Sequence, residues 1–247
     1  MNEWNESFYW DDFAEEYYAI QKESRVPITK DIVTSMKANG ILPAKSVVDV
    51  CGGAGRYLQE LAPLTDRYTL MDFSTEMLHY AEKEREAAQL ENVTFVNQSL
   101  DDFLENDSIK AEVLFAALVP PLQTIEQVEQ MTQKTSKWCV VLRMLDQKDS
   151  LFTPIDTHFG LIDFPEITDA QIMNRFEDHL KRKGYFVKAD DFTYQFEEEV
   201  SKDFFEEYYE EYQETEYFLD RVNEEFLRSD SQINTTTIHY RALYWKK

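Results

Sequence analysis

The chain has 247 residues, of which 43% are hydrophobic and 14% aromatic, which is typical of a packed globular protein and excludes a disordered one. Its 48 acidic and 25 basic residues give a formal net charge of -23, which argues against nucleic acid as a partner, because nucleic-acid-binding proteins carry basic patches. The acidic N-terminus lacks the pattern of a signal peptide, and no apolar run approaches the ~20 residues of a membrane span, so we expect a cytoplasmic protein without a membrane partner.

Residues 1–45 are predicted to form a helical N-terminal cap. Residues 10–24 and 28–42 both place apolar residues at helical spacing, and the second segment ends at Asn39-Gly40, a typical helix stop. The sequence contains no internal repeat and no glycine-, serine- or proline-rich linker. We therefore expect a single domain over residues 1–247.

Strands and helices alternate after residue 45. Short runs rich in β-branched residues predict five strands, at residues 46–50, 68–73, 93–99, 111–118 and 138–145. Helices are expected between them at about residues 57–62, 74–90 and 124–135. Such alternation predicts crossover connections and a mostly parallel sheet with helices on both faces. Two further strands, at residues 185–196 and 235–247, lack a short crossover between them and are expected to form an antiparallel edge.

Residues 197–230 form an acidic, aromatic insertion before the last strand. They include 14 acidic and 3 basic residues, and Phe204, Tyr208 and Tyr212 recur every four positions. This spacing favours an amphipathic helix that covers the edge of the sheet and exposes a solvated acidic face. The alternative is a lid whose aromatic side contacts a substrate.

A glycine-rich turn follows the first predicted strand in "SVVDVCGGAGRYLQEL", residues 46–61. In a parallel α/β sheet this turn is a usual ligand site. A phosphate-binding loop would end in Gly-Lys-Ser/Thr, but Arg56-Tyr57 follows Gly55 here. A dinucleotide fingerprint would need a third glycine where Leu58 stands, and Asp49 is foreign to that pattern. A dinucleotide-binding oxidoreductase is therefore the less favoured alternative.

The stretch "VVDVCGGAG" resembles the first motif of the class I S-adenosylmethionine-dependent methyltransferases, with Cys51 at the position of its first glycine. The resemblance runs from about residue 10 to residue 148 and points to a prokaryotic subgroup. It implies S-adenosylmethionine as the cofactor. It also implies a Rossmann-like, seven-stranded, mostly parallel sheet with an antiparallel edge strand, a helical N-terminal segment and a helical insertion before the last strand.

The resemblance implies the cofactor-binding residues Tyr17, Asp49, Cys51, Gly53, Gly55, Asp72, Phe73, Met77, Ser99, Leu100, Asp101 and Ala116. Asp72 ends the second strand, 19 residues after Gly53, where a carboxylate can accept hydrogen bonds from both ribose hydroxyls. Asp72 could instead cap the next helix, a role that Ser74 could equally fill. Phe73 and Met77 are expected to pack on the adenine or, alternatively, in the core.

Five other positions carry more specific expectations. Ser99 stands where the family usually has an aspartate, so Ser99, the amide of Leu100 and Asp101 are the expected contacts of the adenine edge. Tyr17 is expected to close on the methionine carboxylate or, alternatively, to pack against the domain. Cys51 is expected to be a buried, inert thiol, beside the methionine moiety.

The sequence does not identify the methyl acceptor. Transfer needs an acceptor held in line with the methyl group and does not require a dedicated base; His158 and Asp156 are weak candidates for one. In "LVPPL", Val119 replaces the asparagine of the N-P-P-Y motif, which argues against DNA adenine methylation. We expect a small-molecule acceptor, and the acidic insertion could attract a cationic one. No metal site is predicted, and a non-catalytic binding or interaction module on the same fold is the alternative function.

Overall fold

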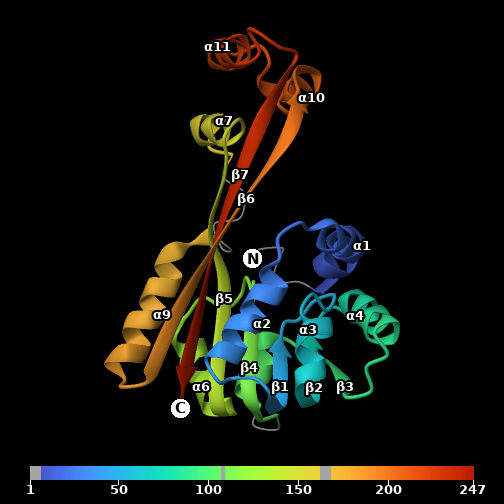
Figure 1. Cartoon of the computed structure of the whole chain (residues 1–247), viewed down its shortest axis with the longest axis vertical. Helices are drawn as coiled ribbons and strands as arrows, with labels where there is room; N and C mark the ends of the chain where they lie inside the picture. Colours follow the sequence, from blue (N-terminus) through green and yellow to red (C-terminus); the bar gives the residue numbers. More distant parts are fainter. Residues whose placement is uncertain (1–6, 107–108, 162–167) are drawn as a thin grey trace. The chain divides into compact units, whose positions relative to one another are not determined.

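The computed structural model describes residues 7–106, 109–161 and 168–247 and contains one seven-stranded sheet (Figure 1). The strand order is β3-β2-β1-β4-β5-β7-β6, and β1 to β5 run parallel. The strands are β1 (Ala44–Val50), β2 (Thr65–Asp72), β3 (Val93–Asn97), β4 (Ala111–Ala117), β5 (Thr135–Asp149), β6 (Phe186–Ser201) and β7 (Ser231–Lys246).

Strand β7 lies between β5 and β6 and runs antiparallel to β5. The amide of Lys247 donates to the carbonyl of Lys137 at 3.1 Å, and the amide of Ser150 donates to the carbonyl of Thr235 at 3.0 Å. One sequence number rises as the other falls, which is the pairing of an antiparallel ladder. The predicted mostly parallel sheet with an antiparallel strand at this edge is confirmed.

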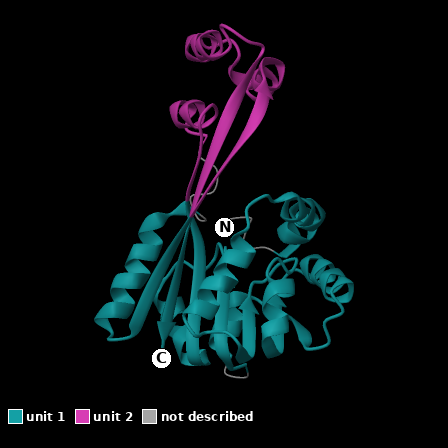
Figure 2. Ribbon diagram, in the orientation of Figure 1, with its two compact units in different colours: residues 1–145, 166–192, 240–247 teal, residues 146–165, 193–239 magenta. Residues whose placement is uncertain are grey.

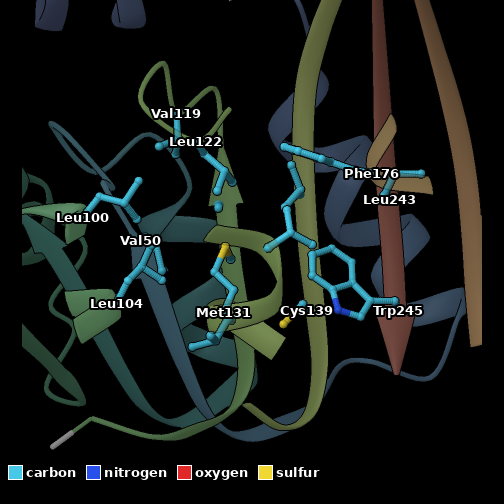
Figure 3. Close-up of a cluster of buried hydrophobic side chains, with 14 of the residues drawn as sticks. Val50, Leu100, Leu104, Val119, Leu122, Met131, Cys139, Phe176, Leu243 and Trp245 are labelled. Atoms are coloured by element: carbon cyan, nitrogen blue, oxygen red, sulfur yellow. The ribbon is translucent and has the colours of Figure 1, made fainter. Parts of the chain in front are cut away.

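Helices cover both faces of the sheet. On one face, α5 (Leu100–Glu105), α6 (Ile125–Lys134) and α9 (Ala170–Arg182) pack on strand residues such as Val50, Cys139 and Trp245 (Figure 3). Helix α9 was not predicted from the sequence; the Asp169 side chain caps its first turn. The other face carries three helices that contact one another in turn, α2 (Ile28–Ala38), α3 (Leu58–Leu61) and α4 (Thr75–Ala87). Among the described helices, none is long and apolar enough to cross a membrane.

Helix α1 (Ser7–Glu23) packs along α4 and is held there by side chains. The Ser74 hydroxyl, at the start of α4, donates to the Asp11 carboxylate at 2.6 Å. Farther along, Tyr18 stacks on Tyr80 with ring centroids 4.7 Å apart and donates a hydrogen bond to Glu84. The N-terminal cap therefore places α1 over the glycine turn, where Ala14 packs with Ala54 and Met77.

The chain forms two compact units (Figure 2). Unit 1 comprises residues 1–145, 166–192 and 240–247, and unit 2 comprises residues 146–165 and 193–239. Unit 2 contains α7 (Thr153–Phe159), α10 (Lys202–Tyr208), a 3-10 turn (Glu210–Tyr212) and α11 (Glu216–Glu225). Its buried cluster includes Leu151, Phe205, Tyr209, Phe218 and Phe226. The two units are a division by contacts within the chain, so the single domain expected over residues 1–247 stays a prediction.

The acidic insertion at residues 197–230 is not the single amphipathic helix that the spacing favoured. Strand β6 continues to Ser201, and the hydroxyls of Ser201 and Thr215 each cap a separate short helix. The aromatic stripe is also shifted by one residue: Phe205 and Tyr209 are buried, whereas Phe204 and Tyr208 are 53% and 57% exposed. A four-residue period identifies the stripe but does not distinguish it from its neighbour when both are aromatic.

Candidate functional site

A cavity of about 650 Å³, its open mouth included, lies in unit 1 at the carboxyl ends of β1, β2 and β4, where α1 also contributes side chains. This is the end of a parallel sheet at which α/β proteins bind ligands. Seven of the residues predicted to bind the cofactor line it: Tyr17, Asp49, Cys51, Gly53, Asp72, Phe73 and Met77.

The turn after β1 needs left-handed backbone at three positions. Cys51, Gly53 and Gly55 have φ values of 54°, 54° and 79°. A Cβ at Gly55 would lie 3.3 Å from the backbone of Ala81, whereas one at Gly53 would meet nothing nearer than Tyr17 Cε1 at 3.7 Å. Gly55 therefore lets α4 approach, and Gly53 leaves room in the cavity. Cys51 adopts the conformation that its glycine counterpart would take freely, at a strain of about 1 kcal/mol.

Gly52 is a site residue that the sequence analysis did not single out. A Cβ there would lie 2.6 Å from Leu70 Cγ and 2.9 Å from the carboxyl carbon of Asp49, so no larger side chain fits without a shift. Because the clash is with residues of β1 and β2, only the structure reveals the constraint. Gly52 keeps the turn close enough to the sheet for its amides to point at the ends of both strands.

Asp72 is fixed at the end of β2 by the amides of the turn. Its Oδ2 accepts from the Gly53 amide and its Oδ1 from the Ser74 amide, both at 2.9 Å. Burial raises the pKa of Asp72 to about 6, although the amide hydrogen bonds lower it. The helix cap is Ser74, whose hydroxyl accepts from the Met77 amide at 3.0 Å. Each carboxylate oxygen of Asp72 therefore keeps a lone pair for a ligand hydroxyl.

Asp49 supplies the second carboxyl group that lines the cavity. It is 1% exposed, and its Oδ2 accepts a hydrogen bond of 2.5 Å from the Tyr68 hydroxyl. Burial raises the pKa of Asp49 to about 7; the Tyr68 bond lowers it and the charge of Asp72 raises it. Burial likewise raises the pKa of the Cys51 thiol well above its usual range, as expected for an inert cysteine.

Five predicted cofactor contacts are not among the described residues that line this cavity: Gly55, Ser99, Leu100, Asp101 and Ala116. The Ser99 hydroxyl caps α5, accepting from the Asp102 amide at 3.1 Å. Leu100 and Ala116 are buried in the hydrophobic core on the α5 face. Whether these residues reach a bound ligand stays a prediction.

The two weak candidates for a base, Asp156 and His158, belong to unit 2. Asp156 accepts a hydrogen bond of 2.6 Å from the Tyr209 hydroxyl, which ties α7 to the buried aromatic cluster. His158 is exposed, and its ring stacks on that of Tyr217 with centroids 3.6 Å apart. Both side chains thus have structural partners within unit 2, and a role for either as a base stays a prediction.

The loop after β4 forms an apolar wall through Leu118, Pro120 and Pro121. Two of its backbone carbonyls accept hydrogen bonds from side-chain amides: Gln123 donates to the carbonyl of Pro120 at 2.9 Å, and Gln127 donates to that of Pro121 at 3.0 Å. The buried guanidinium of Arg143 donates to the carbonyls of Leu122, at 2.8 Å, and Val119, at 3.3 Å.

Val119 is itself 3% exposed, so the position of the asparagine in N-P-P-Y packs into the core here. The loop contributes Leu118, Pro120 and Pro121 to the lining of the cavity.

Sequence reasoning also missed Arg56, Tyr57 and Trp10 as lining residues. Arg56 and Tyr57 were not predicted to contact a ligand, although they directly follow the glycine turn. Within the described ranges, no group of three or more histidine, cysteine or acidic residues could hold a metal ion.

Comparisons with known proteins agree with this geometry. A family model described as a methyltransferase domain matches residues 47–139, which contain the glycine turn, Asp72 and the loop after β4. No curated protein matches the chain significantly.

Among solved structures, magnesium protoporphyrin IX methyltransferase from Synechocystis PCC 6803, crystallised with SAH, matches with a TM-score of 0.58 at 13% identity, over 98% of this chain and 100% of that one. A complex of DhpI with SAH matches with a TM-score of 0.52 at 14% identity, over 94% of both chains. A putative methyltransferase from Bacillus halodurans gives 0.54 at 12% identity, over 87% of this chain and 98% of that one. At these identities the likeness establishes the fold.

Proposed function

We propose that this chain is an S-adenosylmethionine-dependent methyltransferase acting on a small-molecule acceptor, because residues 47–139 match a family model described as a methyltransferase domain and the chain shares the fold of solved methyltransferases. The observation that carries the proposal is Asp72, held by the amides of Gly53 and Ser74 at the end of β2. A carboxylate fixed beside a glycine turn suits a ribose, whose two hydroxyls donate to its free lone pairs. Neighbours crystallised with SAH support the same cofactor.

The residues present fit such a cofactor. Gly53 leaves open the space that a side chain would fill, and the half-buried ring of Phe73 with the Met77 thioether offers an apolar surface for a purine. Trp10 and Tyr17 of α1 close another side, with ring centroids 6.1 Å apart. When bound, the cofactor would supply a methyl group activated by a sulfonium. The aromatic and proline side chains would then exclude water from the reacting atoms.

The acceptor must hold its nucleophilic atom about 3–3.5 Å from the methyl carbon and in line with the breaking bond. The proton that leaves the acceptor can pass to solvent, so a dedicated base is not required. The wall formed by Leu118, Pro120 and Pro121 favours a small acceptor with an apolar surface. The net charge of -23 favours a neutral or cationic acceptor over a polyanion such as nucleic acid. We also propose a cytoplasmic location.

Calorimetric titration with S-adenosylmethionine and S-adenosylhomocysteine tests the proposal. We expect micromolar binding by the native chain and an affinity about 10- to 100-fold lower for Asp72→Asn, which keeps the shape but loses the charged acceptor. Asp66→Asn, an exposed change on β2, is the matched control and should bind normally.

NADH should give no heat. A folded native chain that binds neither adenosyl ligand would refute the methyltransferase and favour a non-catalytic module.

A further inference from the structure

Among the residues that the structure describes, Arg56 has no carboxylate partner, although the chain has 48 acidic residues. Within the described parts of the chain it forms no ion pair, and its Nε is buried with no hydrogen-bond partner. Its contact is with Tyr17, whose ring centroid lies 5.8 Å from the guanidinium carbon. Arginine stays protonated in proteins, so this guanidinium remains a cation that can pair with an anionic ligand.

Tyr57 is the neighbouring buried donor. The residue is 3% exposed, and its ring packs edge-on against Phe115 with centroids 5.0 Å apart. Its hydroxyl is buried and has no hydrogen-bond partner among the residues that the structure describes. Burial raises the pKa of Tyr57, so the phenol keeps its proton and can donate it to an anion. A buried hydroxyl left unbonded is costly, and two such groups on adjacent residues are unusual in a packed interior.

Both side chains line the cavity, and Arg56 is the one basic residue among the described residues that do so. Asp49 and Asp72 line the same cavity, so an anion entering it is repelled unless a cation offsets those carboxyls. The planar guanidinium matches a carboxylate, with which it can form two parallel hydrogen bonds.

We infer that Arg56 and Tyr57 form a carboxylate-binding subsite of the cavity. This inference rests on the proposed function. Two molecules could bring the carboxylate: the cofactor, through its amino-acid portion, or the methyl acceptor. Arg56 also lines a neighbouring polar pocket with Lys22 and Glu84, but there Glu84 is already bonded by Lys22 and Gln59. Glu60 also lines that pocket, but no ion pair joins it to Arg56. Among the described residues, the unbonded nitrogen of Arg56 therefore has no carboxylate partner on that side either.

The test compares two ligands that differ in the carboxylate. S-adenosylhomocysteine carries the amino-acid portion, and 5′-methylthioadenosine lacks it. Calorimetry is run on the native chain, Arg56→Met, Tyr57→Phe and the exposed control Arg67→Met. If the cofactor is the source, Arg56→Met lowers the affinity for S-adenosylhomocysteine about 10- to 100-fold and leaves that for 5′-methylthioadenosine within about twofold. Tyr57→Phe gives a smaller loss of the same kind, because it removes one hydrogen bond.

If the acceptor is the source, Arg56→Met leaves both adenosyl affinities unchanged. Benzoate titrated into the S-adenosylhomocysteine-saturated chain then binds the native protein and not Arg56→Met. Retained 5′-methylthioadenosine binding shows in either case that the variant is folded. Equal loss of both adenosyl ligands, or no difference with any of the three probes, overturns the subsite while the cofactor assignment stands. A native chain that binds neither adenosyl ligand overturns the proposed function and this inference with it.

Discussion

Replacing Asp49 by asparagine should stabilise the free protein at alkaline pH, although the residue lies in the ligand cavity. The carboxyl is 1% exposed, and burial raises its pKa to about 7 from an unfolded value of 3.8. A folded pKa above the unfolded one means that ionisation costs stability, and the cost grows from pH 3.8 to about 7. Asparagine has no such cost and can still accept the hydrogen bond from Tyr68.

The magnitude follows from linkage between proton binding and folding. With these two pKa values the carboxyl costs about 1–2 kcal/mol at pH 5 and about 4 kcal/mol above pH 8, as upper values. The advantage of Asp49→Asn in free energy of unfolding should therefore grow by about 2–3 kcal/mol between pH 5 and pH 8.5. Urea denaturation at both pH values, read by circular dichroism, measures it.

The exposed variant Asp66→Asn on β2 serves as the control and should give the same difference at both pH values. If the advantage of Asp49→Asn does not change between pH 5 and pH 8.5, the carboxyl is not buried as an ion at alkaline pH. A variant less stable than the native chain at pH 8.5 would show that the ionised carboxylate is a net stabiliser of β1. Either result refutes the argument from burial.

Four further substitutions test the glycine turn and the loop after β4. Gly55→Ala should lower the free energy of unfolding by about 1–3 kcal/mol, because its Cβ would meet the Ala81 backbone at 3.3 Å. Gly53→Ala should lower it by only about 1 kcal/mol, but should weaken S-adenosylhomocysteine binding in calorimetry. Cys51→Gly should leave the melting temperature unchanged or higher, since glycine relieves the φ of 54°; a clear drop would contradict the strain. Arg143→Met should cost about 2–4 kcal/mol in urea unfolding, because the carbonyls of the loop after β4 lose a buried donor; a loss below 1 kcal/mol would mean that the loop does not depend on it.

The elements that the sequence predicted well are those with strong local signals. The β-branched run of β1, the glycine turn and the Ser74 cap of α4 all depend on residues within a few positions of one another. Helix α9 was missed although its buried residues, Ile172, Met173, Phe176 and Leu180, follow helical spacing. The mean hydropathy of α9 is low. The segment before α9 contained no predicted strand, so the alternation of strands and helices did not predict this helix.

The candidate site shows the same limit at the level of single residues. Asp72 could be predicted because the family motif fixes its distance from Gly53 along the chain. Arg56 could be seen in the sequence, but the lack of a partner for its buried Nε among the described residues is a property of three-dimensional packing and could not. Gly52 is constrained by Leu70, which is far away in the sequence and close across the sheet. Features that depend on contacts between residues distant in the sequence therefore could not be predicted from the sequence.

The distribution of charge between the two units has a consequence for the conditions under which the protein holds together. Unit 2 contains 18 of the 48 acidic residues and 4 of the 25 basic ones in 67 residues, a net of -14, around a small aromatic core. Repulsion among these carboxylates is screened over about 10 Å at 0.1 M salt and over about 30 Å at 0.01 M. Unit 2 should therefore be the part of the molecule that opens first in dilute buffer, with amide exchange there slowing as salt is added. Ionic strength would act on this unit as a stabilising ligand does on other proteins, without occupying any site.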